Sequence, residues 1–173
     1  MDKEQGEQLP PVCAYIKKKV MPNSNLAKGI FAGLIAGIAA TAAKTIWEDH
    51  FPVRSEDTPT PPALLANRIS EQTGNGPLTD EETSSAETAV HIAFGVGTGA
   101  LYGALAEEVP ETTAGFGLAF GTAFWVGTHG SVIPGMGLEP WPTKVDPRSY
   151  AVNEFLGHLV YGMTLEAVRR VMR

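Results

Sequence analysis

Four long apolar stretches alternate with polar stretches along this chain of 173 residues. The apolar stretches are residues 29–47, 88–106, 112–138 and 149–168. Only three formal charges interrupt them, those of Lys44, Glu154 and Glu166. Because a helix that crosses a bilayer needs about 20 mostly apolar residues, the pattern predicts four transmembrane helices. We place these helices at about residues 28–48, 87–107, 112–132 and 149–170, in an all-α integral membrane bundle.

The polar stretches define the rest of the organisation. Residues 1–27 are polar and predict a disordered cytoplasmic tail, and residues 28–173 then form one membrane domain. Within that domain, residues 49–86 form a loop that is rich in acidic residues and proline. The alternative is a soluble four-helix bundle rich in glycine and alanine.

The glycine spacing favours the membrane bundle over the soluble one. Glycines recur four residues apart on three of the predicted helices, at Gly33 and Gly37, at Gly95, Gly99 and Gly103, and at Gly117 and Gly121. In water each glycine inside a helix costs about 1 kcal/mol relative to alanine. In a bilayer, small residues at this spacing let helix backbones approach closely. We therefore expect these glycines to form the faces on which the helices pack.

The distribution of charge predicts the orientation and the partners. The net charge of −6 gives no support to nucleic-acid binding, so the expected partner is the lipid bilayer. Basic residues lie at or before the start of the first helix and at or after the end of the fourth, at Lys17, Lys18, Lys19, Lys28, Arg169, Arg170 and Arg173. Since positive residues stay on the cytoplasmic side, both termini should be cytoplasmic and the 49–86 loop should face outward. The single cysteine, Cys13, excludes an intramolecular disulfide.

This topology brings six ionisable residues to one depth near the outer side. They are Lys44, Glu48, His91, His129, Glu154 and His158. Lys44 and Glu48 have the i, i+4 spacing of a helical ion pair, as do Glu154 and His158. Near the opposite, inner end, Glu166 should form a salt bridge with Arg169 and Arg170. Ionisable residues inside a membrane usually face the protein interior, pair with one another or have a function.

Three interpretations of this outer layer remain open. The residues can be structural polar contacts between helices. They can respond to acid, because histidine changes charge near pH 6.5 in water. They can also bind a metal ion or haem, with His91, His129, Glu154 and His158 as the candidate ligands. No nucleotide-binding motif, CxxC pair or catalytic triad is present, so we predict no enzymatic activity and no obligatory cofactor.

The same residues carry a family resemblance from about Lys28 to Arg170. The chain resembles the YagU-like inner-membrane family, also called domain of unknown function 1440. The matching residues are Gly33 to Gly37 with Lys44 and Glu48; Pro52 to Arg54; His91, Tyr102, Ala106 and Glu107; His129, Pro134, Met136 to Leu138 and Pro140; and Asn153, Glu154, Gly157 to Leu159, Glu166, Arg169 and Arg170.

The resemblance implies a multi-pass protein of the bacterial inner membrane that is associated with acid resistance. The leading expectation is thus a non-enzymatic protein that aids acid tolerance through its outer layer. The alternatives are a metal- or haem-binding subunit, and a structural subunit that binds another membrane protein or forms a homo-oligomer.

Overall fold

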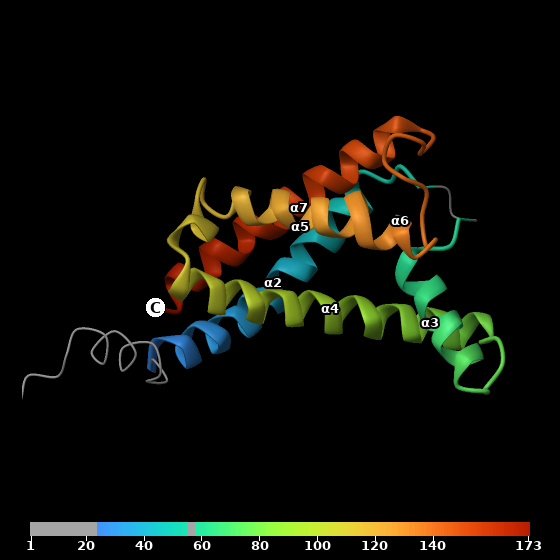
Figure 1. Ribbon diagram of the computed structural model, residues 1–173, viewed down its shortest axis with the longest axis horizontal. Helices are drawn as coiled ribbons and strands as arrows, with labels where there is room; N and C mark the ends of the chain where they lie inside the picture. Colours follow the sequence, from blue (N-terminus) through green and yellow to red (C-terminus); the bar gives the residue numbers. More distant parts are fainter. Residues whose placement is uncertain (1–23, 55–57) are drawn as a thin grey trace, which may run out of the picture.

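The computed structural model describes residues 24–54 and 58–173, and this part of the chain is all-α (Figure 1). The helices are α2 (Ser24–His50), α3 (Pro61–Gln72), α4 (Asp80–Glu108), the 3₁₀ turn η1 (Pro110–Thr113), α5 (Leu118–Gly127), the π-helical turn η2 (Thr128–Val132), α6 (Ile133–Gly135) and α7 (Arg148–Val171). The predicted all-α class is confirmed. Residues 1–23 of the predicted tail, with Cys13 and Lys17 to Lys19, lie outside the described residues.

Local signals explain where the helices differ from the predicted boundaries. α4 begins at Asp80 rather than near residue 87, because the Thr79 hydroxyl accepts from the Glu82 amide and the Glu82 carboxylate accepts from the Thr79 amide. The third helix begins at Leu118 rather than residue 112. Gly115, Phe116 and Gly117 all have positive φ, which a helix does not allow. α2 starts at Ser24, a few residues before the expected position.

α2 and α4 form a close antiparallel pair along their glycines. A Cβ atom added to Gly33 would lie 2.2 Å from the Gly99 carbonyl oxygen, and one added to Gly99 would lie 2.5 Å from the Gly37 Cα. Gly29 and Gly103 meet in the same way further along the pair. The α2–α4 glycine faces therefore contact each other inside one chain.

α5 and α7 form a second antiparallel pair. A Cβ added to Gly121 would lie 2.4 Å from the His158 carbonyl oxygen, and one added to Gly162 would lie 2.4 Å from that of Gly117. The glycine spacing predicts a helical position for Gly117, but this residue precedes α5 and has a φ of 87°. α7 also packs on α2, so the two pairs are joined through these helices. The small apolar core between them consists of Ala36, Ala40, Tyr102, Tyr161 and Leu165.

The two ends of the bundle differ in what they carry. The start of α2, the 109–117 connection and the C-terminus lie at one end, which we call the C-terminal end (Figure 1). The end of α2, α3, α6 and the 136–147 loop lie at the other, which we call the α3 end (Figure 1). Arg68 on α3 donates to the Met136 carbonyl oxygen at 2.8 Å, so α3 is attached to the 136–147 loop.

Among residues 24–54 and 58–173, two helices are long and apolar enough to cross a membrane by length and composition, within residues 25–50 and 80–108. They suggest a membrane protein, but the four spans expected from the sequence are not all evident. α5 has only 10 residues before η2 changes the hydrogen-bonding pattern. α7 contains Glu154, Glu166, Arg169 and Arg170, which lower its hydropathy. The described part of the chain thus has two candidate spans and two helical segments that lie beside them.

Candidate functional site

A cavity of about 830 Å³ opens among α2, α4, η2 and α7 toward the α3 end. Its walls are largely apolar, with Ile38, Phe94 and Phe124 among the lining side chains. All six residues of the predicted outer layer line it: Lys44, Glu48, His91, His129, Glu154 and His158. The cavity therefore combines apolar walls with an ionisable patch.

Lys44 links α2 to α7 at this cavity. Its ammonium group binds the Glu48 carboxylate one turn away on α2, and donates to Glu154 Oε2 on α7 at 3.2 Å. The side chains of Lys44 and Glu154 are each only 10% exposed. Nearby, the Trp47 indole donates to Asn153 Oδ1, and the Asn153 amide donates to the Phe51 carbonyl oxygen. These bonds fix the end of α2 against the start of α7.

His129 lies in η2, whose wider π-helical turn is a type often found at functional sites. Its Nδ1 is 2.7 Å from Glu139 Oε1, and its Nε2 is 3.4 Å from Glu154 Oε2. Because an ionised carboxylate only accepts, the short contact to Glu139 places a hydrogen on Nδ1. In a neutral ring, Nε2 then carries a lone pair that faces the Glu154 carboxylate.

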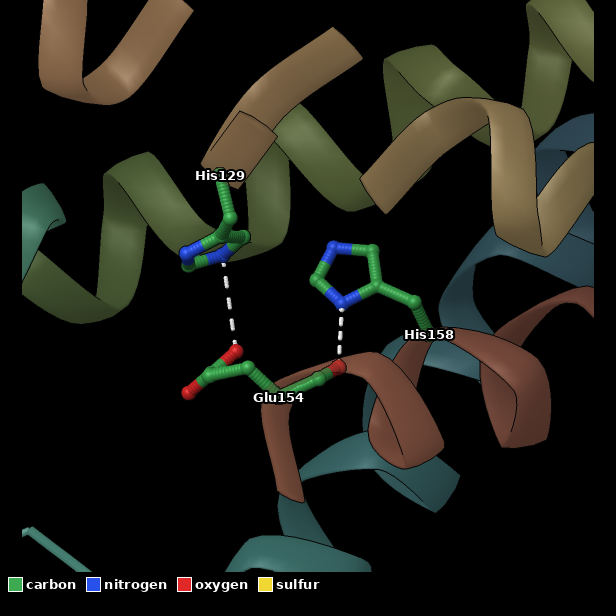
Figure 2. Close-up of side chains that lie close together, drawn as sticks. All are labelled: His129, Glu154 and His158. Atoms are coloured by element: carbon green, nitrogen blue, oxygen red, sulfur yellow. Dashed lines mark hydrogen bonds and ion pairs between the residues drawn. The ribbon is translucent and has the colours of Figure 1, made fainter. Parts of the chain in front are cut away.

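His158 lies one turn after Glu154 on α7 and is 3% exposed. Its Nδ1 donates to the Glu154 main-chain oxygen at 2.7 Å, which again leaves Nε2 with the lone pair. The rings of His129 and His158 meet edge to face, with centroids 5.1 Å apart. Figure 2 shows the His129 ring beside the Glu154 carboxylate and the His158 ring hydrogen-bonded to the Glu154 main chain.

These three residues have the composition of a metal-ligand set. One ligand atom from each of His129, Glu154 and His158 lies within 4.8 Å of the others, and all three residues are buried. Two imidazoles and one carboxylate are a known donor set for zinc and for ferrous iron. In metal sites the second ring nitrogen usually donates to a carboxylate or a main-chain oxygen. Both Nδ1 atoms here already make such bonds.

The charges around these ligands do not balance. We call the group of Lys44, Glu48, Arg54, His129, Glu139, Glu154 and His158 the polar cluster. Lys44 and Arg54 supply its two cationic groups, whereas Glu48, Glu139 and Glu154 supply three carboxylates. With neutral histidines the cluster has one more negative charge than positive, so an additional cation would be favoured there.

Glu139 and its partners are the part of the cluster that the sequence did not predict. Glu139 follows α6 in the 136–147 loop, and its side chain is only 5% exposed. It accepts from the Tyr150 hydroxyl at 2.7 Å and forms an ion pair with Arg54 at 3.5 Å. The only available signal was that Arg54 and the neighbours of Glu139 belong to the family pattern.

His91 lies on the cavity wall but apart from the three ligand residues. It is half-buried on α4 and makes no hydrogen bond or ion pair with the other residues that the structure describes. The predicted set of candidate ligands therefore divides into His129, Glu154 and His158, which converge, and His91, which does not join them.

A second ionic group closes the C-terminal end of the bundle. Glu166 is fully buried and accepts from Arg169, from Arg170 and from the Tyr102 hydroxyl. Glu107 at the end of α4 pairs with Arg173 at 2.7 Å and lies 3.8 Å from Arg169. The expected contacts of Glu166 with Arg169 and Arg170 thus extend to Tyr102 and Glu107 on α4.

Comparison with known proteins adds a family but no function. Residues 34–167 match the family model described as Protein of unknown function (DUF1440), and the match includes the whole polar cluster. No curated protein and no solved structure matches the chain significantly. The resemblance found in the sequence is confirmed: the chain belongs to the DUF1440 family.

Proposed function

We propose that the chain is a multi-pass protein of the bacterial inner membrane whose polar cluster binds a transition-metal ion. Four crossings are formed by α2, by α4, by the helical residues 118–135 and by α7. The support is the distribution of side chains. Apolar residues project outward from all four segments, as at Phe31, Leu101, Val126 and Val152, each more than half exposed. Glu154, His158, Glu166 and Arg169 of α7 are instead buried in the interior, where a bilayer requires ionisable groups.

Both termini are proposed to be cytoplasmic. Lys28 and the three C-terminal arginines lie at the C-terminal end, and Lys3 and Lys17 to Lys19 precede α2 in the sequence (Figure 1). Among the described residues, the α3 end has only four Lys or Arg residues, Arg54, Arg68, Lys144 and Arg148. This asymmetry follows the positive-inside rule. Alkaline phosphatase, which is active only outside the cytoplasm, should be inactive when fused after Arg173 and active when inserted between Thr73 and Thr79. Activity of the Arg173 fusion would contradict the orientation.

The convergence of His129, Glu154 and His158 is the observation that carries the metal proposal. His129 directs its Nε2 toward the Glu154 carboxylate, and the His158 ring packs edge to face against the His129 ring. The Nδ1 atoms of the two rings are held by Glu139 and by the α7 main chain. In a tetrahedral zinc site neighbouring donor atoms are roughly 3.3 Å apart, so the 4.8 Å group needs only small side-chain movements. The proposed role is binding, and no reaction is assigned to the site.

The decisive measurement is the metal content of the full chain purified in detergent. We expect about one zinc or iron ion per chain, and restoration of that value after chelator treatment and addition of Zn²⁺ or Fe²⁺. An absorption spectrum recorded on the same sample tests for haem through its Soret band. Protein that neither retains nor regains a metal ion would contradict the proposal.

A second candidate function is the contribution to acid tolerance that the family resemblance implies. The observation that favours it is the position of the cluster, which opens at the α3 end that is proposed to face outward. In a strain lacking the protein, wild-type chain should restore survival of an acid challenge. A chain with His91→Gln and His158→Gln should restore it less well at equal membrane abundance. Equal survival with both chains would exclude this role.

A further inference from the structure

The Lys44 ammonium group already contacts the Glu154 carboxylate oxygen that a bound metal ion would also need. Its ammonium group is 3.2 Å from Glu154 Oε2, the same oxygen that lies 3.4 Å from His129 Nε2. A cation bound between the two histidines would therefore approach a carboxylate oxygen that is already neutralised by a lysine. Lys44 has a second carboxylate available, because it also binds Glu48 on its own helix.

We propose that Lys44 acts as an internal cation that sets the metal affinity of the polar cluster, and that Glu48 receives its ammonium group when an ion binds Glu154. This inference rests on the proposed metal site. In the empty site, Lys44 neutralises Glu154. When an ion binds, the contact to Glu154 breaks and the contact to Glu48 remains, so neither cation is left without a carboxylate.

The geometry allows this exchange with little movement. The aliphatic part of Lys44 lies over Gly157, where an added Cβ would be 3.5 Å from Lys44 Cγ and 3.6 Å from Lys44 Cε. That contact leaves the end of the side chain to move between the two carboxylates. Glu48 lies nearer the rim, with a side chain 28% exposed against 10% for Glu154. The ammonium group would therefore shift toward the cavity opening and away from the ion.

Neutral substitutions of Lys44 and of Glu48 should change the Zn²⁺ affinity in opposite directions. Lys44→Met keeps the shape of the side chain but removes the charge that repels the ion, so it should bind Zn²⁺ roughly tenfold or more tightly than wild type. Glu48→Gln removes the alternative carboxylate and holds the ammonium group on Glu154, so it should bind Zn²⁺ roughly tenfold more weakly. If the ion pair were purely structural, both substitutions would weaken Zn²⁺ binding.

The experiment is a Zn²⁺ titration of the full chain in detergent against a competing chromophoric chelator. Lys28→Met and Glu108→Gln are the matched controls, since they remove the same charges at exposed positions at the C-terminal end, whereas the cluster lies toward the α3 end. Lys44→Arg keeps the positive charge and should bind like wild type. It also replaces Lys44→Met as the informative variant if the latter does not fold, because tighter binding by Lys44→Arg would contradict the inference.

The outcomes separate the inference from the proposed site. Equal affinity of wild type, Lys44→Met and Glu48→Gln overturns the role of Lys44 but leaves the metal site in place. Zn²⁺ binding by Lys44→Met alone would contradict metal binding by the wild-type chain and the movement of Lys44 to Glu48, since the lysine would then block the site. No binding by any folded variant overturns both.

Discussion

Replacing Gly99 by leucine is expected to prevent stable folding of the bundle. A Cβ at this position would lie 2.4 Å from the Gly33 carbonyl oxygen and 2.5 Å from the Gly37 Cα. These are backbone atoms of α2, so no side-chain rotation relieves the overlap, and the two helices must separate. Overpacking of a rigid interior costs about 1–3 kcal/mol or more, and separation would also expose the neighbouring glycine contacts. The measurement is thermal unfolding of the purified protein in detergent, in which Gly99→Leu should melt far below wild type or fail to accumulate.

Gly97→Leu provides the matched control on the same helix. Nothing lies within 4 Å of a Cβ at Gly97, and the residue is exposed. The gain in helix propensity, up to about 1 kcal/mol, is the same for both substitutions. Gly97→Leu should therefore melt at or above the wild-type temperature. If the two variants melted alike, the close contact of α2 and α4 would be wrong.

Replacing His158 by glutamine is expected to abolish most of the metal binding. The glutamine amide is a poor ligand for zinc, and substitutions even at the residues behind metal ligands weaken binding by about 10–100-fold. The affinity of His158→Gln for Zn²⁺ should fall by roughly 100-fold or more, and that of His129→Gln similarly. Glu139→Gln should have a smaller effect, because Glu139 only orients His129. Competition titrations with a chelator give these affinities directly.

The remaining histidines test whether the loss is specific to the site. His91 stands apart from the ligand group, so His91→Gln should retain wild-type affinity, and His50→Gln on the surface should do the same. Because His158 packs against Phe124, the melting temperature of each metal-free variant must accompany its affinity. An equal loss in His91→Gln, or full affinity in folded His158→Gln, would contradict the assignment of the ligands.

Much of the helical organisation could be predicted from hydrophobic periodicity and length alone. The four apolar stretches correspond to α2, α4, the 118–135 segment and α7. The boundaries depended on finer signals. The Thr79–Glu82 capping box extends α4, and the positive φ values from Gly115 to Gly117 delay α5. The π-helical turn at Thr128–Val132 leaves no mark in the hydropathy pattern, because it contains no Asp, Glu, Lys or Arg.

The candidate site was predictable where its residues lie on helices. Helical spacing and antiparallel topology place Lys44, His129, Glu154 and His158 at one depth, and the structure brings these four together. Glu139 was not predictable, since it reaches His129 only because the chain after α6 folds back toward the bundle. His91 lies at the expected depth, but depth alone does not determine which side chains on different helices converge.

The glycine contacts between α2 and α4 also affect the entropy of folding. Ordering a long side chain at an interface costs up to about 2 kcal/mol of conformational entropy, whereas glycine has no side chain to order. In a bilayer, lipid tails surround apolar side chains as well as a neighbouring helix does, so no hydrophobic effect draws two helices together. Gly29, Gly33 and Gly37 opposite Gly95, Gly99 and Gly103 therefore associate by backbone contact with almost no loss of side-chain freedom.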